Sequence, residues 1–352
     1  MKLGIAIAGV LLLTAAVARA DTPPTVWDTA RDPDVRERWA LHVRVQRLLL
    51  PPPEDEVPIP IVRNEQLELR LEAARALLEE KHAADSPDVR LRFDLGAVYR
   101  LLGEKQGRKD MYELAVRVLA PATEMAHEGD GLTAALENLA YSYANLNRPR
   151  EELAAWRRYI PLLVDDRARA TDMMNLGEAE MRLGHVDDAV ATFREVQRIC
   201  GSLPNQFGVS QTYVLDLWDL AIALDRSGDP QGALENATQA VHMNGMAIMR
   251  SDSNGVFFVP EWERLWYLAL GAMVEAREDK DPAEAVRYWM NAEAQWDEYI
   301  AQSQVDGKDP WLAIARVRRE RTHRELEAAK KRAGKAGQGV PPLPHWQPPK
   351  PM

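Results

Sequence analysis

Apolar residues recur at helical spacing along most of this 352-residue chain. Val35, Trp39 and Val43 follow this period within 26–50, which predicts a first helix that ends before three consecutive prolines at 51–53. A second helix is expected near 64–83, after a stiff proline-rich linker at 51–60. Sustained alternation of apolar and polar residues is absent, so the pattern predicts no sheet.

From residue 89 onward the same period predicts five successive pairs of helices. The first helices of the pairs are expected near 89–102, 133–146, 170–183, 212–227 and 261–277. The second helices are expected near 110–127, 149–163, 186–200, 231–244 and 282–302, and a last helix near 310–333. This order predicts an all-α fold, an α-solenoid of about five helix pairs with extra helices at both ends.

A short signature repeats within these pairs. In the third pair, Gly177 is followed at fixed intervals by Gly184, Ala189 and Phe193. The fourth pair has the corresponding small residues at Ala221, Gly228, Ala233 and Ala237. Small side chains at such positions let two helix backbones cross closely, and each pair then needs its neighbour to cover its apolar face.

These residues resemble the tetratricopeptide repeat (TPR) family, whose pattern includes a Leu-Gly step, a Tyr, an Ala and a large B-helix residue. The Leu-Gly or Leu-Ala step ends at 96, 140, 177, 221 and 271, and large residues stand at Trp156, Phe193 and Trp289. Successive Leu-Gly or Leu-Ala steps lie farther apart than the family's 34-residue period. The resemblance covers about 89–300 and implies a curved stack that binds other proteins.

The chain divides into five segments by composition. Residues 1–20 are similar to a signal peptide, with Lys2, an apolar stretch and Ala18-Arg19-Ala20, so cleavage after Ala20 and a periplasmic or secreted location are expected. An uncleaved membrane anchor is the alternative. The other segments are N-terminal helices and linker (21–88), the solenoid (89–305), a basic helix (306–333) and a proline-rich tail (334–352) expected to be disordered.

Charge and cysteine content narrow the function. The net charge is −10, although residues 308–352 hold 11 Lys and Arg against 4 Asp and Glu, so the rest of the chain is strongly acidic. This disfavours binding to nucleic acid or anionic membranes. The basic last helix is expected to dock on the acidic body or on an acidic partner. Cys200, the single cysteine, is expected to be half-buried, with an intermolecular disulfide as the alternative.

In TPR arrays the first helices of the pairs line a groove, and the resemblance carries these positions to this chain. The groove would be mostly apolar, which suits an amphipathic helix or hydrophobic peptide better than an acidic chaperone tail. Asn138 and Asn175 match one clamp position of the family but lack its lysines. The alternative is a groove filled by the chain's own helices. The expected groove residues are Phe93, Arg100, Tyr141, Met174, Met181, Trp218, Ile222 and Leu265.

A second candidate surface is the aromatic insert at 251–262. Phe257, Phe258 and Trp262 would form an exposed interaction loop or, alternatively, a plug between repeats. The signatures of common catalytic, nucleotide and metal sites are missing, and the seven histidines do not cluster. We therefore expect a cofactor-free scaffold for a protein or peptide partner in the cell envelope, and no enzyme. An envelope enzyme or regulatory subunit with a site near 251–267 is the alternative.

Overall fold

The computed structural model describes residues 31–49, 60–203, 207–250, 260–307 and 309–336. The predicted signal peptide, most of the 51–60 linker, Phe257, Phe258 and nearly all of the proline-rich tail lie outside these residues. Within them every regular element is a helix. The all-α fold predicted from the sequence is confirmed.

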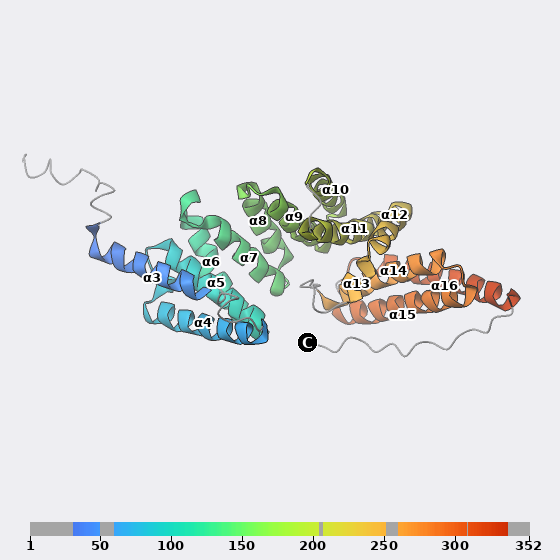
Figure 1. Ribbon diagram of the computed structural model, residues 1–352, viewed down its shortest axis with the longest axis horizontal. Coiled ribbons are helices and arrows are strands. Elements are labelled where there is room, and N and C mark those ends of the chain that lie inside the picture. Colours follow the sequence, from blue (N-terminus) through green and yellow to red (C-terminus); the bar gives the residue numbers. More distant parts are fainter. Residues whose placement is uncertain (1–30, 50–59, 204–206, 251–259, 308, 337–352) are drawn as a thin grey trace, which may run out of the picture.

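Consecutive helices pack against one another along the chain (Figure 1), as expected for an α-solenoid. We call α5, α7, α9, α11 and α14 the A helices, and α6, α8, α10, α12 and α15 the B helices. The bounds are α3 (Pro33–Leu49), α4 (Pro60–Glu80), α5 (Val89–Gln106), α6 (Lys109–Met125), α7 (Leu132–Asn145), α8 (Pro149–Tyr159), α9 (Asp166–Arg182), α10 (Val186–Ser202), α11 (Phe207–Ser227), α12 (Pro230–His242), α13 (Gly245–Arg250), α14 (Arg264–Glu278), α15 (Pro282–Asp306) and α16 (Leu312–Lys335).

Local chemistry sets the ends of these helices. The side chain of Asp229 accepts a hydrogen bond from the Gly232 amide at 2.9 Å, and Pro230 opens α12. Asp165 caps α9 in the same way. Gly184 and Gly228 have φ of 78° and 92°, which explains the recurring glycine between the A and B helices. The six-residue helix α13 was not predicted.

The crossing of A and B helices depends on small residues, as the signature indicated. A methyl group added to Gly177 on α9 would lie 2.5 Å from the Phe193 ring on α10. Phe193, Trp156 and Trp289, the large B-helix residues of the signature, are all buried. Gly177 is therefore retained by close packing and not by an unusual backbone angle.

The buried side chains form two large clusters and a small one between them. The first extends from Val45 to Tyr159 with Ala179, and the second from Met181 to Ala333. Four of the five fully buried tryptophans belong to the second cluster: Trp218, Trp266, Trp289 and Trp296. The C-terminal cluster is thus richer in tryptophan, whereas most of the aromatic residues of the N-terminal cluster are Phe and Tyr.

The basic last helix, α16, docks on the body of the protein, which is one of the two expectations from the sequence. Arg318 on α16 donates from Nε to Asp225 Oδ1 on α11 at 2.6 Å, and both side chains are nearly inaccessible. Arg226 pairs with Glu263 at 2.5 Å, and its guanidinium lies over the rings of Trp266 and Trp311 at 4.4 and 5.1 Å. These contacts join α16 to the fourth and fifth pairs.

Candidate partner-binding surface

The structure changes the picture of the predicted groove. Six of its eight residues are buried: Phe93, Met174, Met181, Trp218, Ile222 and Leu265. Only Arg100 and Tyr141 keep substantial exposure. The interpretation of the six as an accessible lining is therefore wrong, because they contribute to the packed interior. Whether a partner binds to the inner surface stays a prediction.

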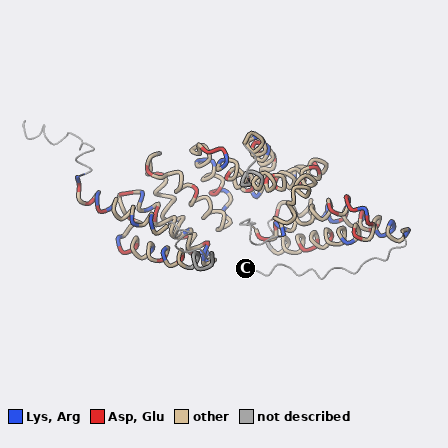
Figure 2. The backbone as a smooth tube through the Cα atoms, viewed as in Figure 1, with Lys and Arg blue, Asp and Glu red and all other residues tan. Residues whose placement is uncertain are grey.

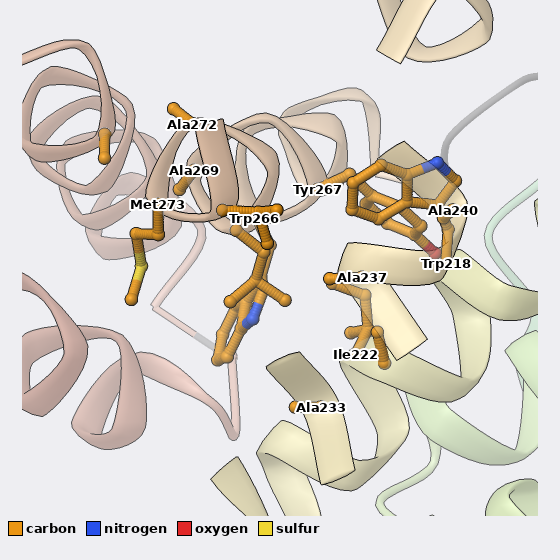
Figure 3. Close-up of a cluster of buried hydrophobic side chains, with 14 of the residues drawn as sticks. Trp218, Ile222, Ala233, Ala237, Ala240, Trp266, Tyr267, Ala269, Ala272 and Met273 are labelled. Carbon is orange, nitrogen blue, oxygen red and sulfur yellow. The ribbon is translucent and has the colours of Figure 1, made fainter. Parts of the chain in front are cut away.

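Trp218 illustrates why these positions are closed. Its side chain has no accessible surface, and it lies among residues of α12, α13 and α14 (Figure 3). A methyl group on Gly245 of α13 would lie 2.6 Å from Trp218 Nε1, and one on Gly271 of α14 would lie 3.2 Å from the indole ring. The short helix α13 and the close approach of α14 cover the inner side of α11.

The aromatic insert has one predicted site residue, Trp262, within the described part of the chain. Trp262 is half-buried, and its ring meets the Tyr299 ring edge-on at 5.1 Å. Tyr299 in turn contacts the Trp266 ring at 5.1 Å. Trp262 therefore packs on the C-terminal core, which agrees with the plug interpretation at this residue.

On α5, α7 and α9 the inner side keeps some partly exposed polar residues, although Phe93, Met174 and Met181 are buried there. Arg100 donates from Nε to Asn138 Oδ1 at 2.8 Å, and its guanidinium lies 5.7 Å from the centre of the Tyr141 ring. Asn175 Nδ2 approaches the Tyr141 hydroxyl at 3.5 Å. Each of these side chains is only half-buried. We call this set, Arg100, Asn138, Tyr141 and Asn175, the polar row.

Acidic groups flank the polar row. Burial raises the pKa of Glu137, whose carboxylate has no hydrogen bond in the described part of the chain; Arg100 acts in the opposite direction. Burial also raises the pKa of Asp172 to about 6, although the Tyr159 hydroxyl donates to it at 2.9 Å. The pKa of Tyr141 is raised to about 12 by burial and by these two acids. Tyr141 therefore stays neutral and can act as a hydrogen-bond donor.

A second acidic group lies between α9 and α11. Burial and the nearby Asp219 raise the pKa of Glu178 well above its usual value, and Glu178 makes no hydrogen bond to any described residue. Burial raises the pKa values of Asp216 and Asp219 to about 8. The Tyr267 hydroxyl donates to Asp219 at 2.8 Å. At neutral pH this region holds protons that ordinary carboxylates would release.

Sequence reasoning missed Asp172, Asp216 and Asp219 as buried acids. Each interrupts the apolar pattern of an A helix, at a position next to predicted core residues. An acid at such a position is either a buried polar group or a solvated one, and the sequence pattern alone does not distinguish the two.

Other kinds of site have little support in the structure. Among the residues that the structure describes, no group of three or more His, Cys, Asp or Glu could hold a metal ion. No helix of the described ranges has the length and apolar character needed to cross a bilayer. Cys200 is buried, and burial together with the nearby Asp216 raises its thiol pKa, so it stays a thiol at neutral pH.

Comparison with known proteins finds likenesses among solved structures. No protein-family model and no curated protein matches the sequence. The crystal structure of BtubC (BKLC) from P. vanneervenii is similar, with 18% sequence identity and a TM-score of 0.42. The match covers 64% of this chain and 96% of that chain.

Proposed function

We propose that this protein is a TPR-type scaffold that binds a segment of a partner protein on the inner side of α5, α7 and α9. The proposal is carried by the polar row and its flanking acids. Tyr141, Glu137 and Glu178 are partly buried. Within the described residues, no group accepts a hydrogen bond from the Tyr141 hydroxyl, and no group donates one to the carboxylate of Glu137 or Glu178. Their polar atoms still reach water, so a ligand that bonds to them exchanges water hydrogen bonds for its own, with a net gain of about 1 kcal/mol for each bond.

The chemistry of the row favours a peptide over a small substrate. Asn138 and Asn175 lie on successive A helices, and amide side chains can pair with the backbone of an extended segment. Arg100 and Tyr141 offer a flat cationic and aromatic surface for a side chain of that segment. A basic side chain opposite Glu178 would favour the ionised carboxylate. No cofactor is needed for this activity.

The proposal also includes a TPR assignment and export. The crossing of Gly177 with Phe193 and the glycine turns at Gly184 and Gly228 support the assignment. Export rests on the sequence of residues 1–20 alone. Sequencing the N-terminus of the protein recovered from its native cells tests it, since cleavage after Ala20 would leave Asp21 as the first residue.

Site-specific photo-crosslinking tests the binding surface. A photoreactive residue is introduced at Ala134 on α7 or Thr171 on α9, which are exposed beside the polar row, and at the exposed Glu113 or Arg194 on B helices. We expect one defined adduct in native cells from the first two positions and none from the others. Adding Tyr141→Ala should abolish it. Equal crosslinking from both sides, or adducts that persist in the Tyr141→Ala protein, would contradict the proposal.

A further inference from the structure

An open cavity of about 440 Å³ lies on α3 and α4, which stand at one end of the helix array in Figure 1. We propose that this cavity is a second interaction surface, which binds an acidic segment of a partner protein that also carries an apolar side chain. This inference does not depend on the proposed function, because the cavity and the polar row are built from different residues. The cavity is lined by Trp39, Ala40, Val43, Arg44, Arg47, Leu48 and Arg70.

Trp39 forms the aromatic wall of the cavity and is held in place from behind. The Arg90 guanidinium lies 4.9 Å from the centre of its ring, and Asp88 fixes that guanidinium with hydrogen bonds of 2.8 and 2.7 Å. The His42 ring lies 5.4 Å away and is tied to Asp94 at 2.7 Å. Trp39 nevertheless remains 50% exposed. A fixed tryptophan with this exposure can bind a side chain at little cost in conformational entropy.

The charge of the lining is entirely positive, in a protein whose net charge is −10. Arg44 and Arg47 have no carboxylate partner in the described part of the chain, whereas about half of the other arginines there form ion pairs. Arg70 donates from Nη2 to the Arg47 carbonyl, which holds its guanidinium at the cavity. Basic and acidic positions are interspersed along the helices (Figure 2), so this local excess is not a general property of the surface.

Three carboxylates on the same two helices have partners other than these arginines. Glu37 pairs with Lys81 at 3.1 Å, and Glu72 pairs with Arg75 at 2.7 Å. Glu68 accepts a hydrogen bond from Gln106 at 2.9 Å. The cavity therefore offers guanidinium groups that match carboxylates in geometry and charge.

The residues that line the cavity also indicate which kind of anion binds there. Val43 and Leu48 give the cavity an apolar floor beside Trp39, so its best ligand combines an apolar side chain with neighbouring carboxylates. A free phosphate would leave the floor uncovered. An anionic membrane would be repelled by the net negative charge of the protein as a whole. An acidic protein segment satisfies both the floor and the arginines.

The test uses the full chain and a fluorescein-labelled peptide, Gly-Glu-Asp-Phe-Glu-Glu-Leu-Asp-Glu, with fluorescence polarisation as the readout. Arg44→Gln with Arg47→Gln should weaken binding by about tenfold, and Trp39→Ala by a similar factor, as for other interface anchors. The matched control is Arg117→Gln with Arg150→Gln, which removes two exposed charges elsewhere and should change the affinity less than about twofold. Circular dichroism melting checks that each variant is folded.

Five outcomes would overturn the inference. The first is that the peptide does not bind to the wild-type chain. The second is that the control pair weakens binding as much as the Arg44→Gln, Arg47→Gln pair does. The third is that a peptide with Gln and Asn in place of its acids binds as tightly as the acidic peptide. The fourth is tighter peptide binding when Glu54, Asp55 and Glu56 are changed to Gln, Asn and Gln, since the chain's own linker would then be the occupant. Vesicles of phosphatidylcholine and phosphatidylglycerol should not bind the chain; binding lost in the Arg44→Gln, Arg47→Gln protein would be the fifth outcome and would assign the cavity to lipid.

Discussion

The inner faces of the two halves of this array differ in what covers them. On α5, α7 and α9 the inner side keeps half-buried polar residues such as Asn138 and Tyr141. On α11 the same side is covered by α13 and α14, and Arg318 of α16 binds Asp225. The helix pairs themselves are alike. The difference teaches that added elements, and not the repeat, determine whether a stretch of the inner face can receive a partner.

The largest expected effect comes from truncating the residue at the centre of the closed half. Trp218→Ala should lower the free energy of unfolding by about 3–5 kcal/mol, because it leaves a cavity among fully buried side chains. Tyr141→Ala in the open half should cost only about 1–2 kcal/mol, since part of that side chain already meets water. Urea denaturation measures both. Equal losses would remove the distinction between the two halves.

The next largest effect is expected from removing the ion pair between Arg318 and Asp225, which holds α16 on α11. Arg318→Ala should cost about 3 kcal/mol or more, because it leaves the Asp225 carboxylate buried without its charge partner. The control is Arg319→Ala on the same helix, whose pair with Asp297 is exposed and should contribute less than about 1 kcal/mol. Trypsin should then cleave within α16 in the first variant before the second. Identical digestion patterns would show that this ion pair does not hold the helix.

The buried acids predict how stability depends on pH. Burial raises the folded-state pKa values of Asp216 and Asp219 to about 8, whereas an unfolded Asp titrates near about 4. The folded state therefore binds more protons between these values, and the stability present below pH 4 is lost as the pH rises toward about 8.

Melting temperatures measured between pH 5 and 9 should show this loss, with a fall equivalent to about 2 kcal/mol or more. Asp216→Asn with Asp219→Asn should flatten the profile. Asp187→Asn with Asp188→Asn, two exposed acids of α10, should leave its slope unchanged. A wild-type profile that rises with pH would contradict the assignment of neutral buried acids.

The smallest expected effect concerns the crossing of A and B helices, which occurs in both halves of the array. Gly177→Ala should cost about 1–3 kcal/mol, because its methyl group would meet the Phe193 ring. Gly201→Ala on α10 has open space at the same position and should be neutral or stabilising by up to about 1 kcal/mol. Thermal melting of the two variants measures this difference in stability. Equal stability of the two variants would show that the helices do not cross at Gly177.

The sequence predicted the helices well, because they depend on local signals. The apolar period, the prolines at 51–53 and the glycines at 184 and 228 marked helices and their ends. The accessibility of the A helices could not be predicted in this way. Trp218 is covered by α13 and α14, and α16 binds α11 from 93 residues away in sequence. Such contacts depend on long-range packing that no local pattern encodes.

Cysteine labelling tests the contrast between open and closed inner faces most directly. With Cys200→Ala as background, the chain has no other cysteine, so one thiol can be placed at Asn138 on α7 or at Ile222 on α11. A maleimide should react rapidly with Asn138→Cys in the native protein, and with Ile222→Cys only after denaturation. Similar native rates at the two positions would contradict the claim that the array is open in its N-terminal half and closed in its C-terminal half.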